Sequence, residues 1–532
     1  MNSLYYGDNL AILREHIKDE SVDLVYLDPP FNSQTTYNVL FRSPTGEQSL
    51  AQIEAFEDSW HWNEHAENAF DEVLHNGNTD VAELLRALRA FLKENDMMAY
   101  LTMMAIRLIE LHRVLKPTGS LYLHCDPTAS HYLKIVLDTI FGKGNFSSEI
   151  VWKRTHAHSD SKQGRKGFGN IADILLYYTK TNHYVFNTIY LPYDQSYIDK
   201  YYRYRDPDGR RYWLDNLTGP GGAAKGNPYY EVFGVFRHWR YSREKMEKLI
   251  AQGRVVQNKL GNVPQFKRYL DEMPGIPLQN IWTDISPINM MAKERLGYPT
   301  QKPVTLLERI SKVSSNEGDI ILDPFCGCGT AIHAAQKLDR HWIGIDITHL
   351  AIGLIERRLK EAFPGIRYEV HGTPKDVDGA QALAAHDKYQ FQWWAVSLVD
   401  AVPYGGKKKG ADTGIDGLIY FKPDGKTTEK AVVSVKGGEH VSVPMIRDLG
   451  HVVEREKAKI GVFITLASPT KPMQTEAWKA GFYETLYGKF PKLQILTIAD
   501  LFAGKKPQLP WLDPASFKKA RQEDTTRQEK LF

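Results

Sequence analysis

Two short segments of this chain carry residue types that could do chemistry, and the first is Asp28-Pro29-Pro30-Phe31. An amine attached to an aromatic ring is a poor nucleophile because its lone pair is delocalised into the ring. The Asp28 carboxylate and the Pro29 carbonyl can accept the two N–H bonds of such an amine, which frees the lone pair for in-line attack. Phe31 offers a face for stacking, worth about 1–3 kcal/mol per nucleic-acid base. The segment favours group transfer to an exocyclic amine.

The second segment is Leu322-Asp323-Pro324-Phe325-Cys326-Gly327-Cys328-Gly329-Thr330. A strand that enters a glycine turn and then a helix can bind a nucleotide, since glycine lets the backbone approach the ligand and the helix begins with free N–H groups. The Asp323 carboxylate suits a cationic amino-acid group rather than a pyrophosphate. Asp346 closes the next predicted strand, where it can bind ribose hydroxyls. Together these acids favour S-adenosylmethionine over NAD or ATP.

The elements that must position these segments alternate between strands and helices. Asp28 follows a buried strand, which the two prolines end. The predicted strands are 21–27, 120–124, 319–322 and 342–345, and the predicted helices are 96–116, 126–141, 331–338 and 349–362. Strands and helices in this alternation predict a doubly wound, Rossmann-like α/β sheet.

Composition limits the class of protein. The 532 residues suggest about three domains, and 42% hydrophobic with 25% charged residues indicates folded protein. No apolar run approaches the ~20 residues of a membrane span, and the N-terminus lacks the basic start and apolar core of a signal peptide. Three cysteines exclude a disulfide-built protein and favour the cytoplasm. With a net charge of +3, nucleic-acid binding must depend on local patches.

Cys326 and Cys328 could suggest zinc. Cys125 is the one further cysteine and no second pair follows, so the ligand count argues against a metal in this glycine turn.

A region over 151–296 differs in composition, because aromatic and basic residues alternate there. We expect an inserted recognition region that contacts DNA, since phosphate binding and base stacking use these residue types. An ordinary surface with arginines stacked on tyrosines is the alternative. The candidate DNA-binding residues are Arg203, Arg205, Arg210, Arg211, Arg237 and Arg240.

Residues 1–362 resemble the DNA adenine-N6 and cytosine-N4 methyltransferases of the β arrangement. Asp28-Pro29-Pro30-Phe31 is similar to their catalytic motif, 322–330 to their methionine-binding loop, and Tyr298-Pro-Thr-Gln-Lys-Pro303 to the segment before that loop. Gly7-Asp8-Asn9 is similar to the start of the permuted chain, beside the cofactor adenine, and Asp346 to the acid that binds ribose. These matches follow the family's order along the chain.

The resemblance implies a permuted methyltransferase sheet, with the catalytic half at 1–150 and the cofactor-binding half at 297–364. It implies methyl transfer from S-adenosylmethionine to a base flipped out of double-stranded DNA. In the family, an Asp at the first motif position goes mainly with adenine, so Asp28 favours adenine N6; cytosine N4 is the alternative. Relatives of this arrangement are often dimers, so a homodimer is a state to test. No membrane partner is expected.

The resemblance also assigns roles to single residues. Catalysis falls on Asp28, Pro29, Pro30 and Phe31, and cofactor binding on Asp8, Thr300, Lys302, Asp323, Phe325, Cys326, Gly327, Gly329, Thr330 and Asp346. Three of these have simpler alternatives: Lys302 as a surface lysine, Thr300 as the cap of a helix over 304–313, and Asp8 as the N-cap of a helix over 9–17.

Residues 380–503 resemble the PD-(D/E)xK restriction-endonuclease fold, with strands over 414–421, 430–436 and 460–465 and a helix over 444–458. In that fold Asp416 would bind Mg²⁺ or Mn²⁺, and Lys436 would assist the attacking water. The family's second acid falls on Ser434, so the metal loses a charged ligand; Asp387 or Gln392 on the preceding helix could contribute. A polar, basic tail follows over 504–532.

Two alternatives to a methyltransferase with an appended nuclease-like domain stay open. One is a single-chain restriction–modification enzyme that also cleaves DNA with a metal. The other is a C-terminal domain kept only for DNA binding. The state of Asp416 and Lys436 separates these two.

Overall fold

The structure is a computed structural model that describes the chain except residues 1, 31–34, 43–47, 59–61, 76, 156–167, 290–291, 293, 297, 299, 405–413, 425, 487 and 511–532. For 35–42 and 48–58 the backbone alone is described. Residues 188–279 form a compact unit of their own, and the remaining described residues form the other. Each unit is presented by itself.

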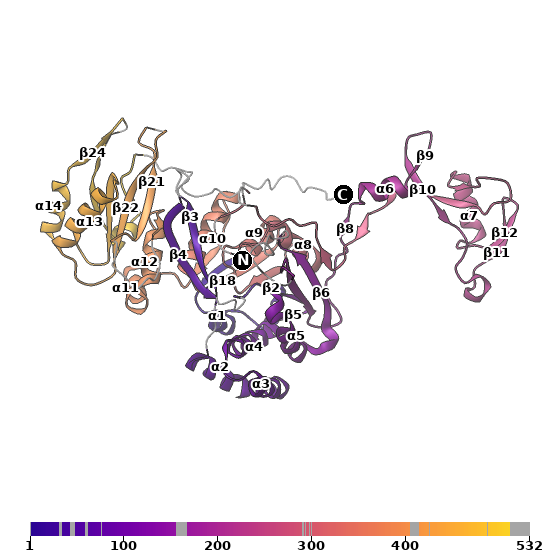
Figure 1. The fold of residues 1–532 in the computed structure, drawn as a ribbon, viewed down its shortest axis with the longest axis horizontal. Helices are drawn as coiled ribbons and strands as arrows, with labels where there is room; N and C mark the ends of the chain where they lie inside the picture. The colour runs from indigo at the N-terminus through magenta and orange to yellow at the C-terminus, as the bar shows by residue number, and fades with distance from the viewer. Residues whose placement is uncertain are drawn as a thin grey trace. The chain divides into compact units, whose positions relative to one another are not determined.

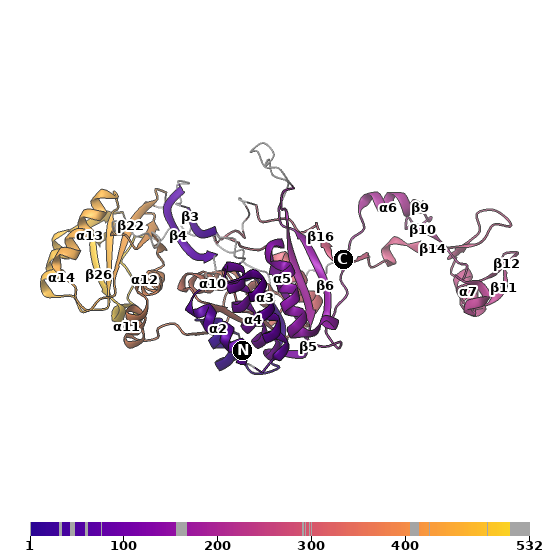
Figure 2. The same ribbon diagram turned by 60° about the horizontal axis from the view of Figure 1, so that its bottom comes forward.

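The larger unit is built on a nine-stranded sheet in the order β16-β6-β7-β5-β2-β17-β18-β1-β19 (Figures 1 and 2). The strands are β1 (Ser3–Tyr6), β2 (Val22–Leu27), β5 (Leu115–Cys125), β6 (Phe146–Lys153), β7 (Ala172–Thr179), β16 (Ile281–Trp282), β17 (Ile320–Asp323), β18 (His341–Asp346) and β19 (Glu369–His371). The six strands from β5 to β19 are parallel to their neighbours, and β7 runs antiparallel to β5 and β6. The predicted α/β class is confirmed.

The reversed order of the two halves still makes one continuous sheet. Strand β17, from late in the chain, lies between β2 and β18, with Leu322 opposite Val25. All six residues of β2 are buried, as expected for a central parallel strand covered on both faces.

Helices cover both faces of this sheet. Figure 1 shows α1 (Asn9–His16), α4 (Asp96–Val114) and α5 (Pro127–Leu137) on one face, and α8 (Val304–Ser314), α9 (Thr330–Lys337) and α10 (His349–Ala362) on the other. The first face buries Leu13, Val25, Leu101, Leu108 and Leu123 in one apolar cluster. Helices α2 (Glu64–His75) and α3 (Thr79–Leu92) pack against α4, and β3 (Thr35–Arg42) pairs with β4 (Gln48–Asp58).

Helix boundaries differ from those predicted by one to a few residues, and α4 and α5 are the two examples with a clear physical reason. Helix α4 ends at Val114, because Leu115 already pairs with Val22 while Ser120 pairs with Leu24. The residues between them, Pro117 included, therefore bulge out of the ladder. Helix α5 begins after Asp126, whose side chain caps it, and continues as a π-helical turn over Asp138–Gly142.

The region predicted over 151–296 is divided differently in the structure. Strands β6, β7 and β16 belong to the large sheet, and the separate unit covers 188–279. The apolar run of β7, with Leu175 and Leu176 fully buried, is the sequence signal for a sheet strand in that region.

The smaller unit is a set of short strands and two helices. Its elements are β8 (Tyr190–Leu191), α6 (Gln195–Tyr201), β9 (Tyr204–Arg205), β10 (Arg211–Asn216), β11 (Tyr229–Val232), β12 (Val235–His238), α7 (Arg243–Ala251), β13 (Val255–Val256), β14 (Gln265–Tyr269) and β15 (Ile276–Pro277). Trp239, fully buried among Tyr230, Met246 and Val255, is the centre of its core. The unit therefore has a small apolar core of its own.

The C-terminal part of the larger unit has a second sheet, ordered β20-β21-β22-β23-β26. Its strands are β20 (Val402–Pro403), β21 (Gly417–Phe421), β22 (Glu429–Lys436), β23 (Ile460–Thr465) and β26 (Leu493–Thr497). One face is covered by α11 (Val377–His386) and α12 (Lys388–Ser397), the other by α13 (Val443–Arg455) and α14 (Lys471–Lys479), each with its own apolar core. Strands β24 (Phe482–Thr485) and β25 (Gly488–Pro491) form a hairpin, and α15 (Ile498–Phe502) ends the domain.

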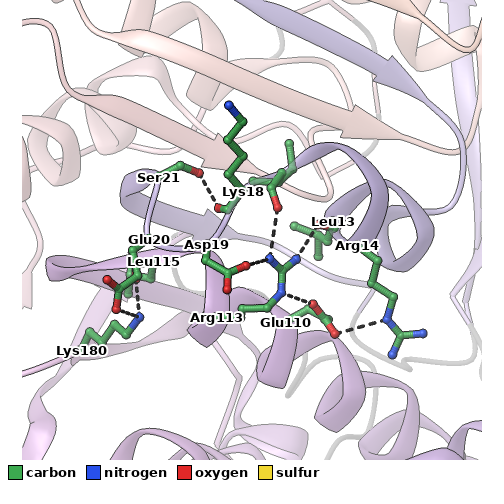
Figure 3. Close-up of polar contacts among 11 residues, drawn as sticks. Leu13, Arg14, Lys18, Asp19, Glu20, Ser21, Glu110, Arg113, Leu115 and Lys180 are labelled. Carbon is green, nitrogen blue, oxygen red and sulfur yellow. Dashed lines mark hydrogen bonds and ion pairs between the residues drawn. The ribbon is translucent and has the colours of Figure 1, made fainter.

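Arg113 fixes the amino end of β2 (Figure 3). Its guanidinium donates to the carbonyls of Leu13 and Ile17 at 2.6 and 3.2 Å, to Glu110 at 2.7 Å, and to Asp19. These two carbonyls lie at the C-terminus of α1, where the last carbonyls of a helix have no backbone N–H to accept from. The Arg113 cation supplies donors to them. The contacts tie α1 to α4 and set where the chain enters β2.

No helix in the described part of the chain combines the length and apolar composition that crossing a membrane requires.

Candidate active site at the carboxyl ends of the parallel strands

The site lies where the direction of the chain through the sheet reverses. From β17 the order continues through β18 and β1, whereas from β2 it continues through β5 on the other side. Such a switch between neighbouring strands opens a crevice at their carboxyl ends. Asp28 follows β2 directly, Asp323 ends β17 and Asp346 ends β18, so three acids meet at this edge.

A cavity at this edge brings most of the candidate residues together. Among those predicted, Asp8, Asp28, Pro30, Thr300, Lys302, Asp323, Phe325, Cys326, Gly327, Thr330 and Asp346 line it. Pro29 is buried, and neither it nor Gly329 is among the lining residues, although Asp28, Pro30, Cys328 and Thr330 beside them are. Phe31 lies outside the described residues.

Asp28 is held by a lysine from a distant part of the chain. Lys302 Nζ lies 2.5 Å from Asp28 Oδ2 and only 8% of the lysine is exposed. Lys302 is therefore not a surface lysine, and its ammonium contacts a carboxylate of the protein itself. Thr300 does not cap α8; Pro303 is the N-cap residue, and Thr300 has a left-handed backbone with φ of 60°.

Asp323 is buried at the base of the loop. Burial raises the pKa of Asp323 well above its usual range, the N–H that Phe325 donates to it opposes this, and repulsion from Asp28 and Asp346 adds to the rise. A cation brought beside Asp323 would relieve this cost, since the ionised carboxylate would gain a charge partner.

Asp346 closes the glycine loop from the other side. It accepts hydrogen bonds from Gly327 N, Thr348 N and Thr348 Oγ1, each at 2.9 Å. Enclosure raises the pKa of Asp346 to about 6, although these hydrogen bonds act in the opposite direction. Gly327 has φ of +49°, and a Cβ there would lie 3.1 Å from Tyr298 Cε1, so a side chain at 327 would be strained and crowded.

Asp8 performs two tasks at the start of α1. Oδ1 accepts from Leu10 N and Ala11 N, which is the N-cap role, and Oδ2 lies 2.9 Å from Arg107. Arg107 also donates to Asn9, which in turn donates to the carbonyl of Pro324 at 2.9 Å. The N-terminus of α1 and the loop after β17 are thereby joined.

Several residues of the site were not predicted. Tyr26 and Tyr298 line the cavity, and Arg107 does so from the middle of α4. Arg358 is buried under the loop, 3.0 Å from the Cys328 carbonyl and 3.2 Å from Thr330 Oγ1. Tyr26 could have been found, because it lies two residues before Asp28 and side chains two apart along a strand point to the same side. The two arginines could not, because a charged residue on a helix is ordinarily read as a surface position.

The two loop cysteines are buried thiols. Burial raises the pKa of both Cys326 and Cys328, and Arg358 partly offsets this for Cys328. Within the described ranges, no group of three or more His, Cys, Asp or Glu side chains could hold a metal ion.

The candidate DNA-binding arginines lie in the 188–279 unit and fall into two groups. Arg203, Arg205, Arg237 and Arg240 are exposed. Arg210 instead pairs with Asp271 and Glu272 at 2.8 Å each and lies 3.9 Å from the centre of the Tyr269 ring, and Arg211 pairs with Asp199 at 2.9 Å. Arg240 lies 3.3 Å from Asp215. Arg210 and Arg211 thus support the unit's own structure.

The nuclease-like residues also meet. Asp416 precedes β21, and its carboxylate accepts from Gln392 Nε2 at 2.6 Å and from Val435 N at 2.5 Å. Ser434 and Lys436 are two residues apart on β22 and therefore share a face of the strand. Ser434 is buried and Lys436 is half-buried. Asp387, the other residue considered on the preceding helix, caps α12 through Tyr389 N and Gln390 N.

Comparison with known proteins decides the family. Residues 22–357 match the model of the N6/N4 DNA methylases. The chain belongs to this DNA methylase family. Residues 383–485 match a restriction endonuclease model, so the methylase carries a restriction-endonuclease-like domain.

Two individual relatives agree with this assignment. The type II methyltransferase M.EcaI of Enterobacter cloacae is 30% identical over 67% of this chain and 69% of its own. The Mod subunit of the type III restriction-modification enzyme StyLTI of Salmonella typhimurium is 28% identical over 64% of this chain and half of its own. Among solved structures, TTHA0409 from Thermus thermophilus with S-adenosyl-L-methionine covers 70% of this chain and all of its own, at 16% identity and a TM-score of 0.34.

The raised pKa values predict how cofactor affinity varies with pH. Asp346 ionises only above about pH 6, and the pKa of Asp323 is raised in the same direction. Because the carboxylate is the form that accepts ribose hydroxyls or pairs with a cation, S-adenosylmethionine should bind more tightly as pH rises through 6. Below that pH its affinity should fall by up to about tenfold per pH unit.

Isothermal titration calorimetry between pH 5 and 8 measures this. Asp346→Asn should bind more weakly at pH 8 and lose part of the slope, with Asp319→Asn, an acid outside the lining, as the matched control. A wild-type affinity independent of pH over this range would contradict the prediction.

Proposed function

We propose that this protein transfers a methyl group from S-adenosylmethionine to N6 of adenine in double-stranded DNA. The observation that carries the proposal is the meeting of Asp28-Pro29-Pro30 with the Asp323 and Asp346 loops in one cavity, on strands that are direct neighbours. Family membership supports DNA methylation, and the cavity suggests how the residues divide the work.

The residues of the cavity fit S-adenosylmethionine by their chemistry. Asp323 is a buried acid whose pKa is raised by burial, and it would pair with the amino group of the methionine part. Asp346 would accept the ribose hydroxyls. The glycine turn at 327 leaves space that a Cβ would fill. When bound, S-adenosylmethionine supplies a methyl group on a positively charged sulfur.

Catalysis would then depend on Asp28 and the Pro29 carbonyl. Both accept hydrogen bonds from the N–H groups of the exocyclic amine of the flipped base. These hydrogen bonds localise the lone pair of the amine on its nitrogen. The strand end holds these acceptors in place, because Pro29 is buried and Pro30 cannot continue a ladder. Adenine is favoured over cytosine by the Asp at position 28, on the family pattern.

Replacing Asp28 tests this division of work. Asp28→Ala should lower methyl transfer by at least about 100-fold, while S-adenosylmethionine still binds, because Asp28 acts on the amine more than on the cofactor. Radiolabelled methyl transfer and calorimetry measure the two properties. An Asp71→Ala variant, changed at an acid on α2, should behave as wild type. Normal transfer by Asp28→Ala would contradict the catalytic assignment.

Single-molecule sequencing of DNA from expressing cells would identify the methylated base and the recognition motif.

DNA binding by the 188–279 unit is proposed to rest on its exposed arginines. Arg203→Ala with Arg205→Ala should weaken DNA binding and reduce the slope of log affinity against log salt by about one for each phosphate that the variant no longer binds. Arg210→Ala should mainly lower the stability of the unit, since this arginine pairs with Asp271 and Glu272. Filter binding across a salt series measures the slope, and an unchanged slope in the Arg203/Arg205 variant would contradict the proposal.

A second candidate function is DNA cleavage by the C-terminal domain. The contacts of Asp416 with Gln392 and with Val435 N, which lies between Ser434 and Lys436, favour it because α12, the start of β21 and β22 come together there. With one carboxylate in this group, the metal would need oxygens from Gln392, water and the DNA phosphate. The Ser434 hydroxyl in place of the family's second acid weakens the attraction for the cation.

Cleavage should therefore require Mg²⁺ or Mn²⁺, and Lys436→Ala should abolish it without changing methylation. Unmethylated and methylated plasmids incubated with each metal measure this, with Lys489→Ala, an exposed lysine of the same domain, as control. A wild type that cuts neither plasmid with either metal would contradict cleavage and favour the alternative of a DNA-binding module.

A further inference from the structure

The contact between Lys302 and Asp28 joins residues 274 positions apart. The backbone on both sides of Lys302 is fixed by the fold. Gln301 beside it donates to the Glu294 carbonyl at 2.6 Å and accepts from Leu296 N at 2.8 Å. Pro303 then leads directly into α8. A long side chain that is 8% exposed, on a backbone fixed at both sides, has lost most of its freedom before any ligand binds.

The charges of the cavity explain why a cation is needed there. Asp28, Asp323 and Asp346 come from three neighbouring strands and line one enclosed space. Like charges at such distances raise one another's cost of ionisation. Of the basic side chains in the described lining, Arg107 pairs with Asp8, and Lys302 pairs with Asp28.

We infer that Lys302 is a positioning residue for methyl transfer: its ammonium holds Oδ2 of Asp28, so that the carboxyl group keeps one orientation and Oδ1 can accept the N–H of the target amine. The inference rests on the proposed function. In the reaction the amine nitrogen forms the N–C bond, the C–S bond breaks with its electron pair on sulfur, and the extra proton leaves the nitrogen for water by way of Asp28.

This role differs from the cofactor contact expected from the resemblance. Removing a cofactor contact would reduce the affinity for S-adenosylmethionine, whereas removing a positioning residue would reduce the rate at saturating cofactor.

The kinetic test compares Lys302→Gln, Lys302→Arg and the exposed control Lys360→Gln. At saturating S-adenosylmethionine and DNA, Lys302→Gln should lower kcat about tenfold or more at pH 7. Lys302→Arg should restore most of this rate, and the dissociation constant for the cofactor should stay within about threefold in all three variants. Wild-type kcat with weakened cofactor binding would overturn the inference in favour of a cofactor contact, and an unchanged kcat with unchanged cofactor binding in Lys302→Gln would overturn it outright.

A stability cycle tests the pair even where activity is lost. Lys302→Gln should lower the melting temperature in the wild-type background, because it leaves Asp28 among the other acids of the cavity without its lysine, and should do so much less in the Asp28→Asn background. Equal effects in both backgrounds would contradict the charge pairing. A wild type that methylates no DNA would refute the proposed function. The stability cycle would then still test whether Lys302 and Asp28 stabilise each other.

Discussion

Acidic side chains from neighbouring parallel strands share one enclosed space, and their mutual repulsion is the constraint on which the rest of the site depends. Asp28, Asp323 and Asp346 stand where β2, β17 and β18 end. In a medium of low dielectric, each charge is costly unless a cation or an N–H group faces it. The structure meets this demand with Lys302 at Asp28, with backbone N–H groups at the other two acids, and with a shape that suits a cationic ligand.

The order of the chain matters less to this site than the order of the sheet. A parallel sheet gathers the carboxyl ends of its strands at one edge regardless of which strand comes first in sequence. The Asp28 segment near the N-terminus and the glycine loop near residue 320 therefore lie at one edge through the pairing of β17 with β2. The Asn9–Pro324 hydrogen bond then joins the first helix to the late loop.

Local patterns were sufficient for much of the fold. The apolar run ended by two prolines predicted β2, periodicity predicted α10 at the bounds observed, and the acids at 323 and 346 were expected at strand ends, where they lie. The acids and glycines of the site could be found because strand ends and turns have strong local signals. Whether each residue has the role suggested stays a prediction.

Long-range pairing is what local patterns could not supply. Lys302 and Asp28 are far apart in sequence, and the buried arginines 107 and 358 are of a residue type common on surfaces although they lie on the buried faces of their helices. The start of the smaller unit was misplaced for a related reason: aromatic and basic composition was taken as the boundary, while β6 and β7 satisfy their hydrogen bonds in the large sheet.

The way the chain enters and leaves the 188–279 unit has an evolutionary consequence. Its first and last strands, β8 and β15, pair antiparallel, with Ile276 opposite Leu191. The two crossing points of the insertion are thus side by side, and the entropy of closing a loop between them depends only weakly on how long the insertion is. Units of different sequence and length could therefore occupy this place without disturbing the strands that carry the acids, so the insertion and the cavity are free to diverge at separate rates.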